Sequence, residues 1–301
     1  MTEPRGGLVV GAHGRHVVVE DDDGRRRLCH LRGKKNEAVV GDHVRWEPAP
    51  GDGAEGVVQR VEPRRNLFFR QDEWRTKSFA ANLDGLLILV AGEPMFSEQQ
   101  LARALVAAEA AGVPALIALN KTDLPAAEVA RERLQPYRAM GQAVVELSLK
   151  TDPQGSLATL APHLHGRTTL VLGPSGTGKS SLVNRLLPDA QAQVGEISQA
   201  LNSGRHTTTT STWYWLDEAR RSALIDSPGF QEFGLRQVSA QDLPNLMPDL
   251  REHAGGCRFY NCTHRQEPGC AVRQAVDDGR VAPSRWQIYQ TIREELERTR
   301  W

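Results

Sequence analysis

The sequence predicts an α/β protein with three domains: a small β-barrel, a central domain built on a parallel sheet, and a short helical domain. Three observations lead to this fold class. Short β-rich runs separated by Gly, Asp and Pro come first, apolar strands then alternate with Ala-rich helices, and a crowded Cys/His stretch follows. We place the domains at residues 1–68, 69–236 and 237–301.

Composition sets broad limits on the function. The 301 residues are 40% hydrophobic, which is enough for several cores. The 37 basic and 37 acidic residues cancel, so no overall field draws the chain to nucleic acid or membrane. No apolar run approaches the roughly 20 residues that span a bilayer, and residues 1–11 lack a signal-peptide pattern. We therefore expect a cytoplasmic protein with no membrane partner.

The first domain contains five short runs of strand-forming residues between Gly, Asp and Pro turns. Strands are predicted at residues 8–10, 16–19, 39–40, 44–46 and 56–58. Five short strands at this spacing are typical of a small barrel.

The central domain alternates strands with helices. Strands are predicted at residues 86–91, 115–119, 143–147, 168–172 and 221–226, and helices at 97–111, 126–140, 155–163 and 179–187. This rhythm predicts a parallel sheet with helices on its faces. Beyond residue 235 the rhythm stops, and an amphipathic helix is predicted at residues 284–300.

Residues 173–180 (GPSGTGKS) match a phosphate-binding loop, with a predicted strand before it and a predicted helix after it. Backbone N–H groups of such a loop surround the phosphates, Lys179 reaches the β- and γ-phosphates during catalysis, and Ser180 binds Mg²⁺. A plain Gly-rich turn is the alternative, and the strand and helix context disfavours it. The predicted phosphate-binding residues are Gly173, Ser175, Gly176, Thr177, Gly178, Lys179, Ser180 and Ser181.

A base-reading motif follows the second predicted strand of the central domain. Asn120, Lys121 and Asp123 resemble the Asn-Lys-x-Asp guanine-specificity motif of GTPases. The Asp123 carboxylate can accept from N1–H and N2–H₂ of guanine, whereas adenine would leave it unpaired at a cost of about 1 to 3 kcal/mol. Taken alone, Asp123 could simply cap a helix. Paired with the phosphate loop, the motif predicts a guanine nucleotide.

Two further segments fit a GTPase. Asp226 and Gly229 resemble the Asp-x-x-Gly switch, in which the aspartate holds Mg²⁺ and the glycine N–H senses the γ-phosphate. Phe230 occupies the position where many GTPases have a water-orienting glutamine. In residues 204–210, where the first switch belongs, Thr208 is the predicted Mg²⁺ ligand. His206 is the candidate water-orienting residue, with a solvated loop histidine as the alternative.

The third domain contains Cys257, Cys262, His264 and Cys270 within one short stretch. In a reducing compartment this crowding suggests a metal before a disulfide. Three thiolates and one imidazole suit a tetrahedral Zn²⁺ with no open position, so one structural zinc ion is predicted.

The guanine motif precedes the phosphate loop, whereas conventional GTPases begin with the phosphate loop. This order resembles the RsgA/YjeQ family of circularly permuted GTPases, which act in maturation of the bacterial small ribosomal subunit. The likeness includes residues 31–34 (LRGK), 40–44 (VGDHV) and 204–209 (GRHTTT), and the Cys/His spacing. It implies an OB-fold barrel, a permuted GTPase domain and a zinc-containing helical domain.

The resemblance also adds roles. Ser148, Leu149 and Lys150 look like the family's guanine-supporting Ser-Ala-Lys loop, although Leu149 departs from alanine. Basic residues at 25–27 and 32–35 leave RNA binding and a solvated face equally open, and the resemblance favours RNA. We expect a monomer that binds the small subunit and its rRNA, with GTP hydrolysis stimulated by the subunit. A metabolic nucleotide-triphosphatase or kinase and an RNA-binding scaffold are the rival readings.

Overall fold

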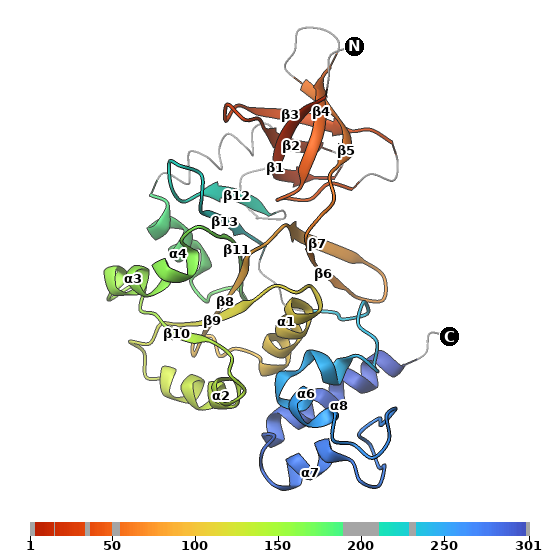
Figure 1. Cartoon of the computed structure of the whole chain (residues 1–301). Helices are drawn as coiled ribbons and strands as arrows, with labels where there is room; N and C mark the ends of the chain where they lie inside the picture. The colour runs from red at the N-terminus through yellow and green to blue at the C-terminus, as the bar shows by residue number, and fades with distance from the viewer. Residues whose placement is uncertain are drawn as a thin grey trace.

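The computed structural model describes residues 4–14, 16–33, 37–49, 55–188, 211–228 and 233–298. Figure 1 shows a barrel at the N-terminal end, an α/β sheet in the middle and a group of helices at the C-terminal end. Among these residues, no helix is both long and apolar enough to span a membrane.

The N-terminal domain is a closed five-stranded barrel, which confirms the predicted fold. Its strands run in the order β1-β2-β3-β5-β4, and β4 pairs back onto β1. The core includes Val9, Val17, Cys29 and Trp46, all fully buried. The strands are β1 Arg5–His13, β2 His16–Glu20, β3 Arg26–Leu31, β4 His43–Pro48 and β5 Glu55–Val61.

One of the five predicted barrel strands is wrong. Val39 lies in a turn in which Asp42 N donates to Val39 O and the Asp42 carboxylate accepts from Val39 N, at 3.1 and 2.8 Å. The Asp42 side chain thus takes the hydrogen bond that a strand partner would otherwise make. The sequence did not predict β3, because its first residues are arginines and resemble a surface segment. Cys29 and Leu31 of this strand are nevertheless buried in the barrel core.

An unpredicted hairpin connects the barrel to the central sheet. It consists of β6 Leu67–Gln71 and β7 Thr76–Ala81, paired antiparallel. It holds the chain after the second switch, because Gln71 bridges Leu235 and Phe233 packs within 5.8 Å of Phe68, centroid to centroid.

The central domain contains the predicted parallel sheet. Five strands lie parallel in the order β10-β9-β8-β11-β13, and the short β12, which was not predicted, pairs antiparallel with β13. These strands are β8 Gly85–Ala91, β9 Ala115–Asn120, β10 Val144–Glu146, β11 Thr168–Leu172, β12 Thr212–Trp215 and β13 Ala223–Asp226. Since β12 also pairs with β1, the barrel and the sheet are continuous.

Two helices cover each face of this sheet. Helices α1 Glu98–Ala110 and α2 Ala127–Ala139 pack on one face, and α3 Pro153–Leu164 and α4 Lys179–Leu186 pack on the other. Alternate residues of each strand point into the hydrophobic cores on the two faces of the sheet. Because both faces are buried, the strands appear in the sequence as unbroken apolar runs.

The C-terminal helices pack against α1 and α2. They are η1 Leu243–Leu246, α6 Pro248–Ala254, α7 Ala271–Asp277 and α8 Pro283–Glu297. Arg285 of α8 donates two hydrogen bonds to Asp249 at 2.8 and 3.1 Å, and its guanidinium lies 4.9 Å from the centroid of the Tyr137 ring. Arg103 of α1 also pairs with Glu295 of α8. The helical domain is therefore attached to α1 and α2 by the contacts of Arg103 and Arg285 as well as by apolar contacts.

Candidate nucleotide and metal sites

The predicted nucleotide motifs meet at the carboxyl edge of the parallel sheet, where open α/β sheets bind ligands. The register brings the strand ends together, since Leu119 pairs with Glu146 and Val171 pairs with Asp226. The phosphate loop follows β11, the guanine motif follows β9, and residues 148–150 follow β10.

Close contacts with neighbouring atoms explain two glycines of the phosphate loop. A Cβ at Gly173 would lie 2.4 Å from Leu89 O, so no side chain fits there. Gly178, directly before α4, has a φ of 103°, and a Cβ there would lie 2.4 Å from Asn120 Nδ2. Thr177 is buried and its hydroxyl donates to Pro174 O at 2.9 Å, whereas Ser175, Gly176, Ser180 and Ser181 are exposed.

Asn120 joins the guanine motif to the other two loops. Its Nδ2 donates to Thr177 O at 2.9 Å, and its Oδ1 accepts from Leu149 N at 3.2 Å. The side chain is only 3% exposed, so both bonds are shielded from water. The Asn120 side chain thereby hydrogen-bonds to Thr177 and Leu149, which lie 57 and 29 positions away in the chain.

Asp123 lies at the open side of the same site. Its Oδ1 accepts from Ser148 Oγ at 2.6 Å, and this hydrogen bond lowers the pKa of Asp123. Lys150 and Lys121 also favour the charged carboxylate. Lys121 adopts a left-handed φ of 62° and donates from Nζ to Glu93 O at 2.7 Å. The exposed carboxylate is ionised and available to a base.

Lys179 and Asp226 interact electrostatically at the predicted phosphate-binding side of the site. Lys179 Nζ donates to Gly173 O at 2.7 Å, and burial lowers the pKa of this lysine. Burial raises the pKa of Asp226 to about 6, opposed by the Lys179 charge. Asp226 Oδ1 is buried and has no hydrogen-bond partner among the described residues. An orphaned carboxylate oxygen suits a cation or its bound water.

Several predicted site residues lie outside the described part of the chain. They are His206, Thr208 and Gly229, together with the rest of residues 204–210 and Phe230.

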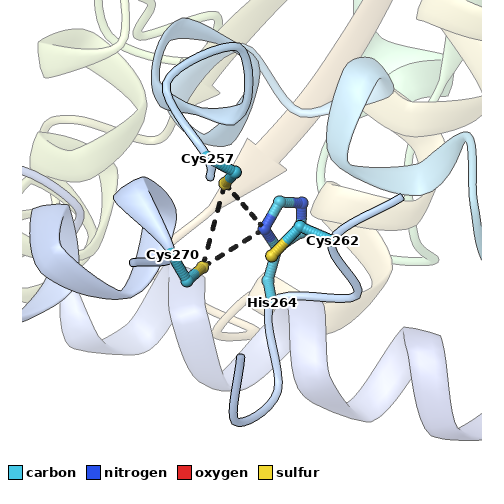
Figure 2. A group of neighbouring side chains, drawn as sticks. All are labelled: Cys257, Cys262, His264 and Cys270. Carbon is cyan, nitrogen blue, oxygen red and sulfur yellow. Dashed lines mark hydrogen bonds between the residues drawn. The ribbon is translucent and has the colours of Figure 1, made fainter. Parts of the chain in front are cut away.

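The four predicted metal ligands come together in the C-terminal domain (Figure 2). Cys257 Sγ lies 3.6 Å from His264 Nδ1 and 4.0 Å from Cys270 Sγ, and His264 Nδ1 lies 3.4 Å from Cys270 Sγ. All four ligand atoms, Cys262 Sγ included, lie within 4.8 Å of one another. Burial lowers the pKa of His264, which favours the neutral imidazole that a metal requires.

Glu267, which the sequence analysis overlooked, organises the loop between these ligands. Its carboxylate accepts from Thr263 N at 2.6 Å and from Arg265 N at 2.9 Å. Hydrogen bonding, first from Thr263, lowers the pKa of Glu267 to about 2. Arg293 of α8 donates to Thr263 O at 2.6 Å, so the loop is also tied to the long C-terminal helix. The position of a carboxylate three residues after His264 was the feature of the sequence that could have indicated this role of Glu267.

The structure describes only part of the predicted basic clusters at 25–27 and 32–35. Arg26 donates to Glu20 at 2.9 Å, and the Arg27 guanidinium lies 5.8 Å from the Trp46 ring centroid. Arg25 is largely exposed, whereas Lys34 and Lys35 lie outside the described residues.

The fold and this constellation define a circularly permuted GTPase, because the guanine motif precedes the phosphate loop in the chain yet shares one site with it. The model of the RsgA GTPase family matches residues 61–236. A small ribosomal subunit biogenesis GTPase RsgA from Variovorax paradoxus is 57% identical over 98% of this chain and 93% of the relative. A protein of the same name from Paraburkholderia xenovorans is 53% identical over 95% and 92%.

Solved structures agree with these sequence comparisons. YjeQ from Thermotoga maritima matches with a TM-score of 0.73 and 30% identity, covering 98% of this chain and 99% of that one. YloQ, described as a circularly permuted GTPase, matches with a TM-score of 0.71 and 27% identity over 99% and 97%. The chain belongs to the RsgA GTPase family. It is therefore an enzyme of the class that hydrolyses GTP.

Proposed function

We propose that this GTPase binds the small ribosomal subunit through its rRNA and hydrolyses GTP to GDP and phosphate during late maturation of the subunit. We further propose that the subunit stimulates hydrolysis and that hydrolysis drives release. The observation that carries the nucleotide part is the Asn120 side chain, which unites the guanine motif, the phosphate loop and the 148–150 loop. The relatives' printed name supports the ribosomal part.

In this proposal Asp123 reads the guanine N–H groups, while Asn120 and Lys121 shape the base site. Ser148, Leu149 and Lys150 support the base from the other side, with Leu149 N already engaged by Asn120. Phosphates bind at the N-terminus of α4, where loop N–H groups and the helix dipole favour anions. Lys179 exchanges its bonds to loop carbonyls for phosphate oxygens.

Magnesium would be held by Ser180, Thr208 and Asp226, and it would neutralise phosphate charge during hydrolysis. Gly229 would sense the γ-phosphate and His206 would orient water. The orphaned Asp226 Oδ1 and its proximity to Lys179 support the magnesium assignment.

A structural zinc ion fits the Cys/His cluster. Tetrahedral zinc, with bonds of about 2.3 Å to sulfur and about 2.1 Å to nitrogen, separates two sulfurs by about 3.8 Å and sulfur from nitrogen by about 3.6 Å. The measured separations of 3.4 to 4.0 Å match this geometry. Cys257, Cys262, His264 and Cys270 would hold the metal.

We propose three domains with separate roles. Residues 1–68 form an RNA-binding OB-fold, residues 69–236 form the GTPase domain and residues 237–301 form the zinc domain. The protein would act as a cytoplasmic monomer. Exposed Tyr260 and Arg258, which lies over Phe259, could contact RNA from the zinc domain.

The ribosomal proposal is tested by measuring GTP hydrolysis with and without purified small subunits. Stimulation by small but not large subunits supports it, and equal rates with and without small subunits refute it. Lys179→Ala is the control that should abolish turnover in both conditions. Guanine reading is tested separately, because Asp123→Asn should shift preference from guanine to xanthine nucleotides.

A further inference from the structure

The barrel contacts the GTPase domain through a strand that lies beside the proposed magnesium ligand. Thr212 of β12 pairs with Gly11 of the barrel on one side and with Asp226 of β13 on the other. Neighbouring strands lie about 4.8 Å apart, so only one strand separates the barrel backbone from Asp226. A register shift in β1 between Val9 and Gly11 bends the barrel strand at this point.

At its other end β12 is held by a buried carboxylate of the barrel. Glu20 is only 5% exposed, and its Oε1 accepts from Trp215 Nε1 at 2.8 Å. Its Oε2 accepts from Arg26 Nε at 2.9 Å, and Arg220 Nη1 lies 3.5 Å from Oε1. A hydrogen bond to a buried charge is stronger than a neutral one and strongly directional.

Arg220 closes the contact from the turn between β12 and β13. Its guanidinium lies against Gly24 so closely that a Cβ there would be 1.8 Å from Nη2. The barrel therefore touches this hairpin at its turn, at Trp215 and at Thr212. The backbone pairing of β1 with β12 is a single register pair, whereas β12 pairs with β13 through all four of its residues. The Glu20 bond therefore fixes where the β12–β13 hairpin lies against the barrel.

We propose that Glu20 is a positioning residue for GTP hydrolysis: by holding Trp215 it positions the β12–β13 hairpin, which carries the Asp226 carboxylate for Mg²⁺. The barrel thereby contributes to the magnesium geometry of the neighbouring domain. This inference rests on the proposed magnesium role of Asp226.

The test is the Mg²⁺ concentration that half-saturates GTP hydrolysis by the full-length protein without ribosomal subunits. Glu20→Ala and Trp215→Phe should each raise this concentration roughly three- to tenfold, as expected for loss of one such bond. The double variant should be no worse than either single one. Glu20→Gln keeps an oxygen for the indole and should restore most of the effect. Nucleotide affinity measured in EDTA should be unchanged.

Asp42→Asn is the matched control, because Asp42 is a fully buried barrel carboxylate bonded to Arg64 at 2.7 Å. It should lower the urea midpoint and leave the Mg²⁺ requirement unchanged. Half-saturation within twofold of wild type in Glu20→Ala and Trp215→Phe overturns the inference, as does an equal shift in Asp42→Asn. If Asp226→Asn itself leaves the Mg²⁺ requirement unaltered, the magnesium assignment has failed and the coupling falls with it.

Discussion

At the scale of single residues, Asn120 is the side chain on which the nucleotide site depends most. Asn120→Ala would leave Thr177 O and Leu149 N without partners in a buried position. Each lost bond costs about 1 to 3 kcal/mol, so we expect GTP and GDP affinity to fall at least tenfold in calorimetric titrations.

Asn82 provides the control for this prediction. It is also buried, and its Nδ2 bridges to Gly41 O at 2.8 Å, but it lies between barrel and hairpin. Asn82→Ala should reduce stability and spare nucleotide affinity. Equal affinities in wild type and Asn120→Ala would contradict the bridging role.

Asp226 should give the nucleotide-free protein a pH-dependent stability. Its pKa in the folded state is raised from 3.8 to about 6, so the folded state binds the proton more tightly than the unfolded state does. The contribution of Asp226 to the free energy of unfolding is therefore largest below about pH 4, and it is lost as the pH rises through 6. In EDTA, the free energy of unfolding should fall by roughly 1 to 3 kcal/mol across this window. Asp226→Asn should remove this pH dependence of the free energy of unfolding, as measured by urea titrations. If the variant keeps the pH dependence of the wild type, the raised pKa of Asp226 is wrong.

At the scale of elements, the loop from Cys257 to Cys270 depends on its ligands. The four proposed zinc ligands and one carboxylate, Glu267, would replace the apolar core that so short a segment cannot build. Chelation of the metal, or Cys262→Ser, should therefore unfold this loop and loosen α8, which Arg293 ties to it. Hydrogen exchange should rise there and remain unchanged around the phosphate loop.

Cys29→Ala is the control for metal removal, because this thiol is buried in the barrel core, away from the cluster. It should keep the full metal content while losing some stability from the barrel. One equivalent of zinc retained by Cys262→Ser would argue against the four-ligand site.

The sequence located elements well where periodicity was strong. Strand β11 matches its predicted residues, and the central helices agree within two residues at each end. The sequence did not predict β3, whose Arg-rich start resembles a surface patch, or β12, which has only four residues. Short strands show too little alternation to be recognised, because pairing partners rather than intrinsic preference define them.

At the scale of the whole molecule, the barrel is joined tightly to the rest. Gly41 of the barrel packs on the hairpin, where a Cβ would lie 2.2 Å from Ala81 O at a φ of 89°. Ala81 N also donates to Val40 O at 2.9 Å. Gly41→Ala should therefore cost roughly 2 to 4 kcal/mol in unfolding free energy, from strain and lost contact together.

Gly14 separates these two costs. It has a φ of 60° with nothing within 4 Å of a Cβ, so Gly14→Ala should cost only about 1 kcal/mol. Both variants are compared by urea denaturation. Equal losses would mean that the contact between barrel and hairpin adds nothing.

The sequence by itself determined the chemistry that we propose for this protein. The phosphate loop, the guanine motif and the proposed metal ligands are local motifs whose residue types and spacing suit the groups they would bind, and the permuted order of the two nucleotide motifs is visible in the printed chain. Tertiary structure alone decided how they are connected. The Asn120 bridge and the Glu20 contact to Trp215 join residues 29 to 195 positions apart, and the fold leaves one Asp226 oxygen buried without a hydrogen-bond partner among the described residues. Such pairings depend on strand order and register, which no local pattern encodes.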